Sequence, residues 1–410
     1  AMVVFFIGKR FFAVAATAVV FFAAQQFAGQ STADKLRSQL VRYADLSEAE
    51  VAAMEKGEIV VKRVKTAEDQ DVAIFGMVKI AERRPITMAE FRESLSQRGN
   101  KEMEGKGRFS DPPNISDLAT LELEDRDFDE LRKCRVGDCD INMSAKWIGR
   151  FSTEIDWSKA DHRPKATELF RSMMLEYASE YSSKGASSLS KNVNRKEPLD
   201  LSEAHRELLR ELPLLDDFVR GLRQYLYEFP AGTLSGVRNE LHWSAVDFGL
   251  NPTVTLTHAV AFTNGIAGND SHFVLTRQFY STRYLDASIS LTALLRIPNG
   301  EAVESYIVFT DRSRSDALGG VLGGVARTAV EAEAVDRVRR LLETSSARLA
   351  KPEAEQRQVD VVVEAEPQSW AGWLRSNWLL ATSAMLVLLG LGSYLLFPKR
   401  PGRDPIGRDK

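Results

Sequence analysis

The sequence predicts an α+β domain built on a large antiparallel sheet, followed by one C-terminal transmembrane helix. Residues 239–311 read as successive strands separated by turn residues such as PNG. Apolar residues recur every three or four positions in residues 164–182, 202–229 and 316–349, which is typical of helices. Ser376 to Phe397 carry no charge, and this stretch is long enough to cross a hydrocarbon core about 30 Å thick.

The first 30 residues have the order of a secretory signal. Lys9 and Arg10 precede the apolar run from Phe11 to Ala24, and small and polar residues follow. An A-x-A cleavage pattern is not cleanly present, so residues 1–30 are either a signal peptide or an uncleaved N-terminal anchor. Either alternative predicts export of the domain that follows, residues 31–350.

The C-terminal end predicts a tether. Residues 351–370 are acidic and proline-bounded and are typical of a linker, and residues 371–397 form the predicted transmembrane helix with tryptophans at one rim. Residues 398–410 form a basic tail, which the positive-inside rule places in the cytoplasm. We therefore expect a bacterial inner-membrane protein with a single C-terminal pass and its large domain in the periplasm or outside.

The elements of the domain follow in order. Ser47 and Glu50 form a capping-box pattern, which predicts a short helix ending before Gly57. Glu58–Lys65 and Asp71–Ile80 are the arms of a hairpin, and the second arm is apolar on both faces, so we expect it to be buried on both sides.

Helices and strands then alternate in blocks. A helix is expected within residues 85–96, a helical insertion occupies about residues 146–230, and strands fill residues 239–311. A glycine-bearing segment, LGGVLGG, leads into a long final helix that ends near Leu349.

Two cysteines, Cys134 and Cys139, are the only ones in the chain. In an exported protein, two thiols on either side of a short glycine-containing segment can close a small disulfide loop. The alternative is a pair of free buried thiols, because the segment supplies too few ligands for a metal site.

Several function classes are disfavoured. The net charge is −3 and no basic stripe occurs, which argues against nucleic acid as a partner. The five histidines lack metal-ligand spacing, and neither G-x-S-x-G nor GxxxxGK is present. We expect no metal and no cofactor, and we assign no catalytic residue.

The element order resembles the helix-grip fold of the START-like superfamily, the lipid-transfer domains and polyketide cyclases. The segments that carry the resemblance are GEIVVKRV, DVAIFGMVKI, TVTLTHAVAF, SHFVLTRQFYSTRYLDASISLTALLRI, ESYIVFTDRSR and VARTAVEAEAVDRVRRLLETSSARL. The chain departs from that pattern by its helical insertion and by a strand pair before the helices. The resemblance implies a curved antiparallel sheet wrapping the long C-terminal helix around an apolar cavity.

A small set of residues stands out as candidate ligand contacts. Each of them also has a structural alternative as a core or solvated side chain, and for His258 the alternative is a core histidine satisfied by one hydrogen bond. The candidates are Trp243, Phe248, His258, Tyr280, Tyr284 and Arg312.

Two groups of side chains near the strand ends have the same ambiguity. Strict alternation puts six polar side chains on one face, which is either solvated or the polar wall of a cavity; they are Tyr280, Thr282, Tyr284, Asp286, Ser288 and Ser290. A second group, at the strand ends, is either an entrance for a charged head group or a solvated rim; it comprises Arg283, Asp311, Arg312 and Arg314.

The resemblance and the predicted topology together suggest a membrane-tethered domain that binds or transfers a hydrophobic ligand such as a lipid. Two alternatives stay open. One is an envelope enzyme of the polyketide-cyclase or hydrolase kind, with His258 or a carboxylate as base. The other is a non-catalytic protein-interaction module.

Overall fold

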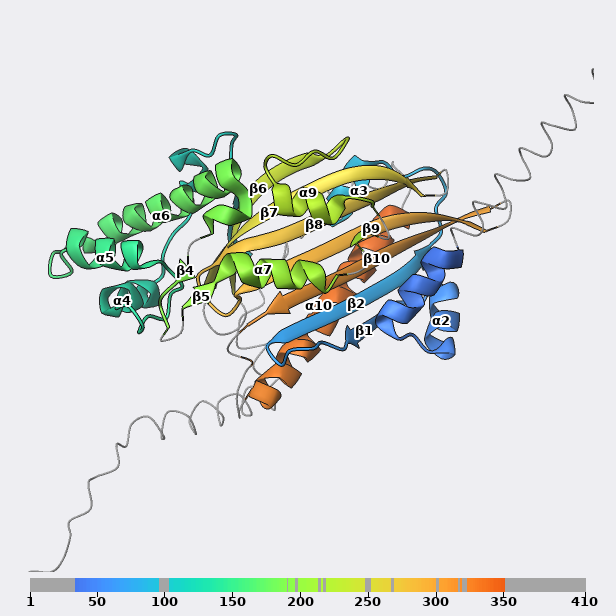
Figure 1. Ribbon diagram of the computed structural model, residues 1–410, viewed down its shortest axis with the longest axis horizontal. Coiled ribbons are helices and arrows are strands. Elements are labelled where there is room, and N and C mark those ends of the chain that lie inside the picture. The colour runs from blue at the N-terminus through green and yellow to red at the C-terminus, as the bar shows by residue number, and fades with distance from the viewer. Residues whose placement is uncertain are drawn as a thin grey trace, which may run out of the picture. The chain divides into compact units, whose positions relative to one another are not determined.

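The computed structural model describes residues 34–95, 103–189, 191–195, 198–212, 215–216, 219–247, 252–266, 269–299, 302–315, 318 and 323–350 (Figure 1). Within this part of the chain no helix is long and apolar enough to cross a membrane. The predicted signal or anchor (1–30), linker (351–370), transmembrane helix (371–397) and basic tail (398–410) lie outside the described residues.

One eight-stranded antiparallel sheet forms the centre of the fold, so the α+β prediction is confirmed. Its strand order is β1-β2-β10-β9-β8-β7-β6-β3. The strands are β1 (Val60–Val64), β2 (Asp71–Ile80), β3 (Met103–Arg108), β6 (Arg238–Asp247), β7 (Pro252–Ile266), β8 (Asn269–Ser281), β9 (Ala287–Asn299) and β10 (Ala302–Arg314). A separate two-stranded ribbon pairs β4 (Lys191–Asn192) with β5 (Leu199–Asp200).

The expected hairpin is the β1–β2 pair, with Val60 opposite Met77. Strand β2 has nine buried residues and one half-buried residue, which confirms the interpretation of an apolar strand covered on both faces. It joins the hairpin to the meander, because Ile307 of β10 lies opposite Val78. The first strand pair is thus connected to the last strand of the meander.

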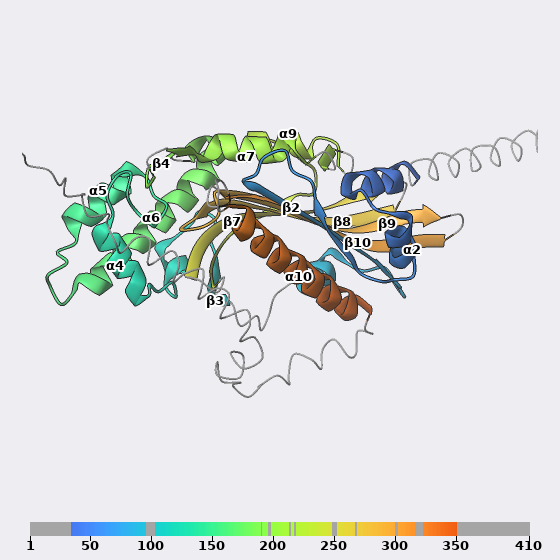
Figure 2. The same ribbon diagram turned by 90° about the horizontal axis from the view of Figure 1, so that it is seen from below.

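Helices cover both faces of the sheet. They are α2 (Glu48–Glu55), α3 (Met88–Ser94), α4 (Asp125–Lys133), α5 (Ala145–Glu154), α6 (His162–Lys184), α7 (Leu201–Arg210), α9 (Leu222–Glu228) and α10 (Gly323–Ala350), together with a helix over residues 34–44. Two short 3₁₀ turns, η1 (Ile115–Leu118) and η2 (Gly185–Ser188), lie between β3 and β6 in the chain. Figure 2 shows α7 and α9 on one side of the curved sheet and α10 on the other.

The apolar core is divided by the sheet. The larger cluster joins one face to the helix over residues 34–44, α2 and the insertion helices. The smaller cluster lies on the other face, where α3 and α10 pack against β2, β9 and β10. We call these the insertion face and the α10 face.

Gly76 allows α10 to approach β2 closely. A Cβ atom at this position would lie 2.8 Å from both Val338 Cγ1 and Leu342 Cδ1, well inside ordinary carbon contact. The C-terminal end of α10 is held by Ser345, whose hydroxyl donates to the Ser94 carbonyl at 3.1 Å. Helix α10 therefore crosses the sheet face in direct contact with β2 and α3.

Local signals explain most helix boundaries. The capping box at Ser47 is present, since Glu50 N–H donates to Ser47 Oγ and Ser47 N–H donates to Glu50. The helix expected over residues 202–229 is instead interrupted: α7 ends at Arg210 and α9 begins only after Gly221, which has φ 83°. A left-handed residue breaks the helical path, so one periodic stretch becomes separate helices.

The expected disulfide is present, joining Cys134 and Cys139 with their Cα atoms 4.4 Å apart. It closes the loop that follows α4, and Gly137 within it has φ 82°, a conformation that favours glycine.

Candidate ligand-binding site

Four of the sequence-derived candidates lie on the insertion face and not beside α10. The sheet register places Trp243 opposite Leu256, and Leu256 opposite Tyr280, all three in the larger core cluster. Trp243 is fully buried, and its indole N–H donates to the Asp117 carbonyl at 2.8 Å. Trp243 is therefore a core residue that anchors η1.

His258 is a buried histidine with both ring nitrogens engaged. Nδ1 pairs with the Tyr181 hydroxyl at 3.0 Å and Nε2 with Asn239 Oδ1 at 2.9 Å. Burial, with a contribution from the charge of Arg277, lowers the pKa of His258 to about 3. The ring is neutral at physiological pH and inaccessible, so it is unsuited to act as a general base.

Tyr280 is likewise a core residue, since it is buried and its hydroxyl donates to the Asn142 carbonyl at 2.5 Å. Tyr284 is half-buried and has a left-handed φ of 63° in the turn between β8 and β9. Phe248 lies outside the described residues.

The expected entrance of charged side chains is absent as a cluster in the described residues. Arg283 pairs with Asp127 and Glu130, Arg312 with Glu211, and Arg314 with Asp71, all on or near the insertion face. These arginines are buried, and they are neutralised by carboxylates of α4, of β2 and of α7 with the residue after it. Arg312 thus joins β10 to the segment after α7 instead of lining an opening.

A β-bulge near the end of β8 changes which face Tyr280 occupies. Thr257 pairs with Gln278 but Leu256 pairs with Tyr280, so one extra residue of β8 turns Tyr280 to the face opposite that of Gln278. Tyr280 points to the insertion face, whereas Ser288 and Ser290 lie on the α10 face, in register with Gln278 and Thr276. That prediction of a shared face was wrong.

The α10 face carries a patch of polar side chains that sequence reasoning did not assemble. The patch consists of two adjacent rows of cross-strand partners on the central strands. One row is Thr257, Gln278, Ser288 and Ser313, and the other is Thr276, Ser290 and Asp311. The members of this hydroxyl patch are Thr257, Thr276, Gln278, Ser288, Ser290, Asp311 and Ser313.

Asp311 is the only carboxylate of the hydroxyl patch. Ser313 Oγ donates to its Oδ2 at 2.7 Å and Ser288 Oγ to its Oδ1 at 3.3 Å. Its side chain is half-buried, and desolvation raises the pKa of Asp311 to about 6 despite these hydrogen bonds. The carboxyl therefore titrates close to neutral pH.

Gln278 supplies an unused hydrogen-bond donor in the same patch. It is 9% exposed, and its amide nitrogen Nε2 has no hydrogen-bond partner among the described residues. A buried amide N–H without a partner costs roughly 1–3 kcal/mol, so such a group calls for an acceptor from elsewhere. In the neighbouring row of cross-strand partners, Thr276 Oγ1 and Ser290 Oγ lie 2.6 Å apart and form a hydrogen bond.

Along the strands away from the hydroxyl patch, the α10 face is first apolar and then carries charged side chains. Val78, Leu294 and Ile307 lie in the middle, under Val338 and Leu342 of α10. This apolar zone separates the hydroxyl patch from a second polar group at the opposite ends of the strands.

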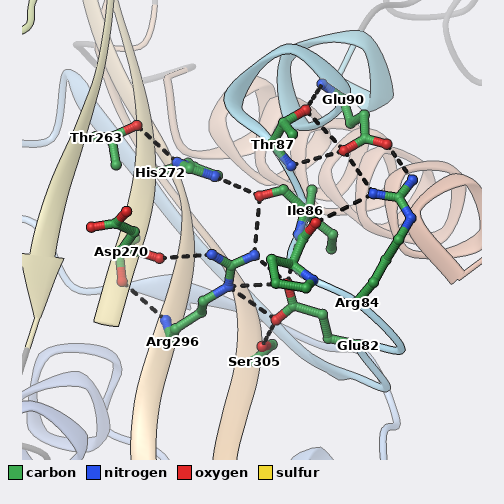
Figure 3. A network of polar contacts seen from close by, with 12 residues as sticks. Glu82, Arg84, Ile86, Thr87, Glu90, Thr263, Asp270, His272, Arg296 and Ser305 are labelled. Atoms are coloured by element: carbon green, nitrogen blue, oxygen red, sulfur yellow. Dashed lines mark hydrogen bonds and ion pairs between the residues drawn. The ribbon is translucent and has the colours of Figure 1, made fainter. Parts of the chain in front are cut away.

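Figure 3 shows that second polar group, which fastens residues 82–87 to the sheet. Arg296 Nε lies 3.0 Å from both carboxylate oxygens of Glu82, Oε1 and Oε2. Arg296 and His272 both contact the Ile86 carbonyl. Burial would raise the pKa of Glu82, but the hydrogen bonds from Arg296 and Ser305 lower it overall. With every main polar group matched, this network is structural and positions α3.

The hydroxyl patch and the neighbouring apolar zone together form an amphipathic surface. Hydroxyls donate and accept, Gln278 Nε2 donates, and Asp311 accepts while ionised. Such a surface suits a ligand with an apolar body and a hydrogen-bonding end. No protein-family model matches this chain, and no curated protein matches it either.

Proposed function

We propose that this domain binds a hydrophobic ligand, such as a lipid, between α10 and the sheet, in the manner of a START-like domain tethered beside a membrane. The observation that carries the proposal is the amphipathic α10 face. There, an apolar zone under Val338 and Leu342 adjoins half-buried hydroxyls and the unpartnered amide of Gln278. Few, well-placed polar groups within an apolar lining are typical of small-molecule sites.

The strand order supports the helix-grip assignment. From β2 the sheet continues through β10, β9, β8, β7 and β6 to β3, so the first strand of the curved sheet adjoins the last strand of the meander. The long helix that follows β10, α10, packs across one face of this sheet against β2. The insertion between β3 and β6 and the extra edge strand β1 are additions to that plan.

The location of the ligand site relative to a membrane rests on sequence. The uncharged segment 376–397 and the basic tail 398–410 favour a tether with its tail in the cytoplasm and the domain in the periplasm or outside. The Cys134–Cys139 disulfide supports export, because structural disulfides persist mainly in oxidising compartments. A tethered domain would stay next to the bilayer that supplies an apolar ligand.

The test is native mass spectrometry of residues 31–350 purified without detergent from a periplasmic expression host, followed by organic extraction. This span contains all the described elements. A retained hydrophobic mass, released on extraction, is the expected result. An empty protein that also fails to bind a fluorescent fatty-acid analogue would refute the proposal.

A matched pair of variants locates the site. Ser290→Phe places a large ring in the hydroxyl patch and should reduce binding of the fluorescent analogue at least tenfold. Ser183→Phe makes the same change at an exposed position of α6, on another part of the chain, and should leave binding unchanged. Equal affinities for both variants would place the ligand elsewhere.

A second candidate function is an enzyme that uses a carboxylate base on this face. Asp311 is the group that favours it, because it is half-buried, held by two serine hydroxyls and has a pKa of about 6. His258, the other base considered, is enclosed in the core. Conversion of the extracted ligand by wild type but not by Asp311→Asn would favour the enzyme.

A further inference from the structure

A separate cluster of polar side chains lies on the insertion face, away from the proposed ligand site. Arg277 of β8 is 1% exposed. Its Nη1 donates to the Leu226 carbonyl at 3.1 Å, but its Nε has no hydrogen-bond partner within the described ranges. His205 of α7 is fully buried, and among the described residues neither of its ring nitrogens meets the geometry of a hydrogen bond. The Gln278 main chain is close enough to raise the pKa of His205 as a hydrogen-bond partner, although burial lowers this pKa overall.

The groups around Arg277 do not neutralise it. His258 and His205 have lowered pKa values, first because of burial and second because of the Arg277 charge itself, so both rings are neutral. Tyr181 also interacts with Arg277, but burial raises the pKa of its hydroxyl, which stays protonated. Among the described residues Arg277 forms no ion pair with an aspartate or glutamate.

Arg277 is the exception among the buried arginines of the described chain. The other four each pair with at least one carboxylate; they are Arg283, Arg296, Arg312 and Arg314. A buried cation without a counter-charge is strongly destabilising, which is why buried charges are normally paired. The lack of a carboxylate partner, and not the unpartnered Nε alone, distinguishes Arg277, because Arg312 Nε also has no partner in the described residues although Arg312 pairs with Glu211.

We propose that a small inorganic anion of the size of chloride binds inside the fold between Arg277 and His205. In the described part of the chain Arg277 Nε–H has no acceptor and the ring N–H of His205 has no well-aligned one, and an anion accepts from both. Both side chains are at most 1% exposed, so a bulky organic acid could not reach them without opening the insertion. The anion would join β8 of the sheet to α7 of the insertion.

The first test is thermal unfolding of the full-length chain in detergent micelles, with chloride replaced by gluconate at constant ionic strength. Binding to the folded state alone should raise Tm by about 2 °C for each tenfold rise in chloride once the site saturates. Arg277→Met should abolish this dependence. Arg312→Met is the matched control, because Arg312 already pairs with Glu211, and it should retain the dependence.

The second test does not depend on a variant that folds. Crystals of the wild-type chain grown with bromide in place of chloride should show an anomalous peak between Arg277 and His205. A Tm independent of chloride in the wild type, or anomalous data without a peak there, would overturn the proposal. Water, and not an anion, would then be the partner of the two donors.

Discussion

The contact between α10 and the sheet can be tested at Gly76, because this glycine sets how closely the helix approaches β2. In Gly76→Ala the new Cβ would lie 2.8 Å from Leu342 Cδ1 and Val338 Cγ1, so these side chains must retreat by about 0.8 Å to reach ordinary contact. Overpacking of this kind costs about 1–3 kcal/mol, and the reduced entropy of the unfolded chain returns about 0.5–1 kcal/mol. We expect a net loss of about 1–2 kcal/mol in the free energy of unfolding.

A double-mutant cycle isolates the contact. Leu342→Ala alone should cost about 2–5 kcal/mol, because Leu342 is fully buried and its loss leaves a cavity. In the Gly76→Ala/Leu342→Ala variant, the added methyl group enters that space, so the double variant should be about 1–2 kcal/mol more stable than the sum of the single effects predicts.

Urea unfolding of residues 31–350, followed by circular dichroism, supplies the free energies. Gly149→Ala is the control: this exposed position in α5 has nothing within 4 Å of the added methyl group, and the change should stabilise the helix by about 0.5–1 kcal/mol. Strictly additive effects of Gly76→Ala and Leu342→Ala would show that α10 does not rest on β2 at this point.

Three further predictions concern ionisable groups. The folded-state pKa of Asp311 is raised from 3.8 to about 6, so the folded state holds this proton more tightly than the unfolded state. The free energy of unfolding should therefore fall as pH rises from about 4 to 6, by at most about 3 kcal/mol and by less with solvent screening. Asp311→Asn should remove this pH dependence in urea titrations. Arg283→Met leaves Asp127 buried without its cation and Glu130 with only the exposed Arg126, and it should cost about 3–5 kcal/mol of unfolding free energy, whereas a loss below 1 kcal/mol would contradict the buried ion pair. The His258 ring should show no titration between pH 5 and 8 by NMR, because its pKa is about 3; a shift midpoint near 6.5 would mean that the ring is open to solvent.

Several elements could be predicted because their signals are local. Ser47 and Glu50 mark the start of α2, since a capping box depends on residues only three positions apart. The doubly apolar run of β2 predicts burial on both faces, and the structure has α2 and the helix over residues 34–44 on one side and α10 on the other. The alternating runs after residue 238 predict the meander for the same reason.

Strand β3 was missed because its residues, MEGKGR, have no strand-like side chains. It forms an edge strand beside β6, and its glycines leave room for the ring of Trp243: a Cβ atom at Gly107 would lie 2.2 Å from the indole nitrogen. That glycine requirement comes from a residue more than a hundred positions away. No local pattern could have revealed it.

The shared face of Tyr280 and Ser288 was mispredicted for a similar reason. Alternation assigns faces correctly only within a regular strand, and the bulge between Gln278 and Tyr280 turns Tyr280 away from the face of Ser288. The large aromatic and basic candidates, Trp243, Tyr280 and Arg312, are the residues that a second layer of helices buries. The polar patch was overlooked because serine and threonine on a strand are equally typical of a solvated face.

By itself the sequence determined the α+β class, the strand-rich centre, the final long helix and the cysteine pair, because these follow from periodicity, capping and spacing along a few turns of chain. Only the tertiary structure decided which side chains of each strand face α10 and which buried arginines pair with a carboxylate. It also decided that Arg277 has no carboxylate partner among the described residues. Those outcomes depend on the pairing of strands and helices far apart in the chain, as in the register that brings Asp311 opposite Ser290 and the packing that brings His205 near Arg277.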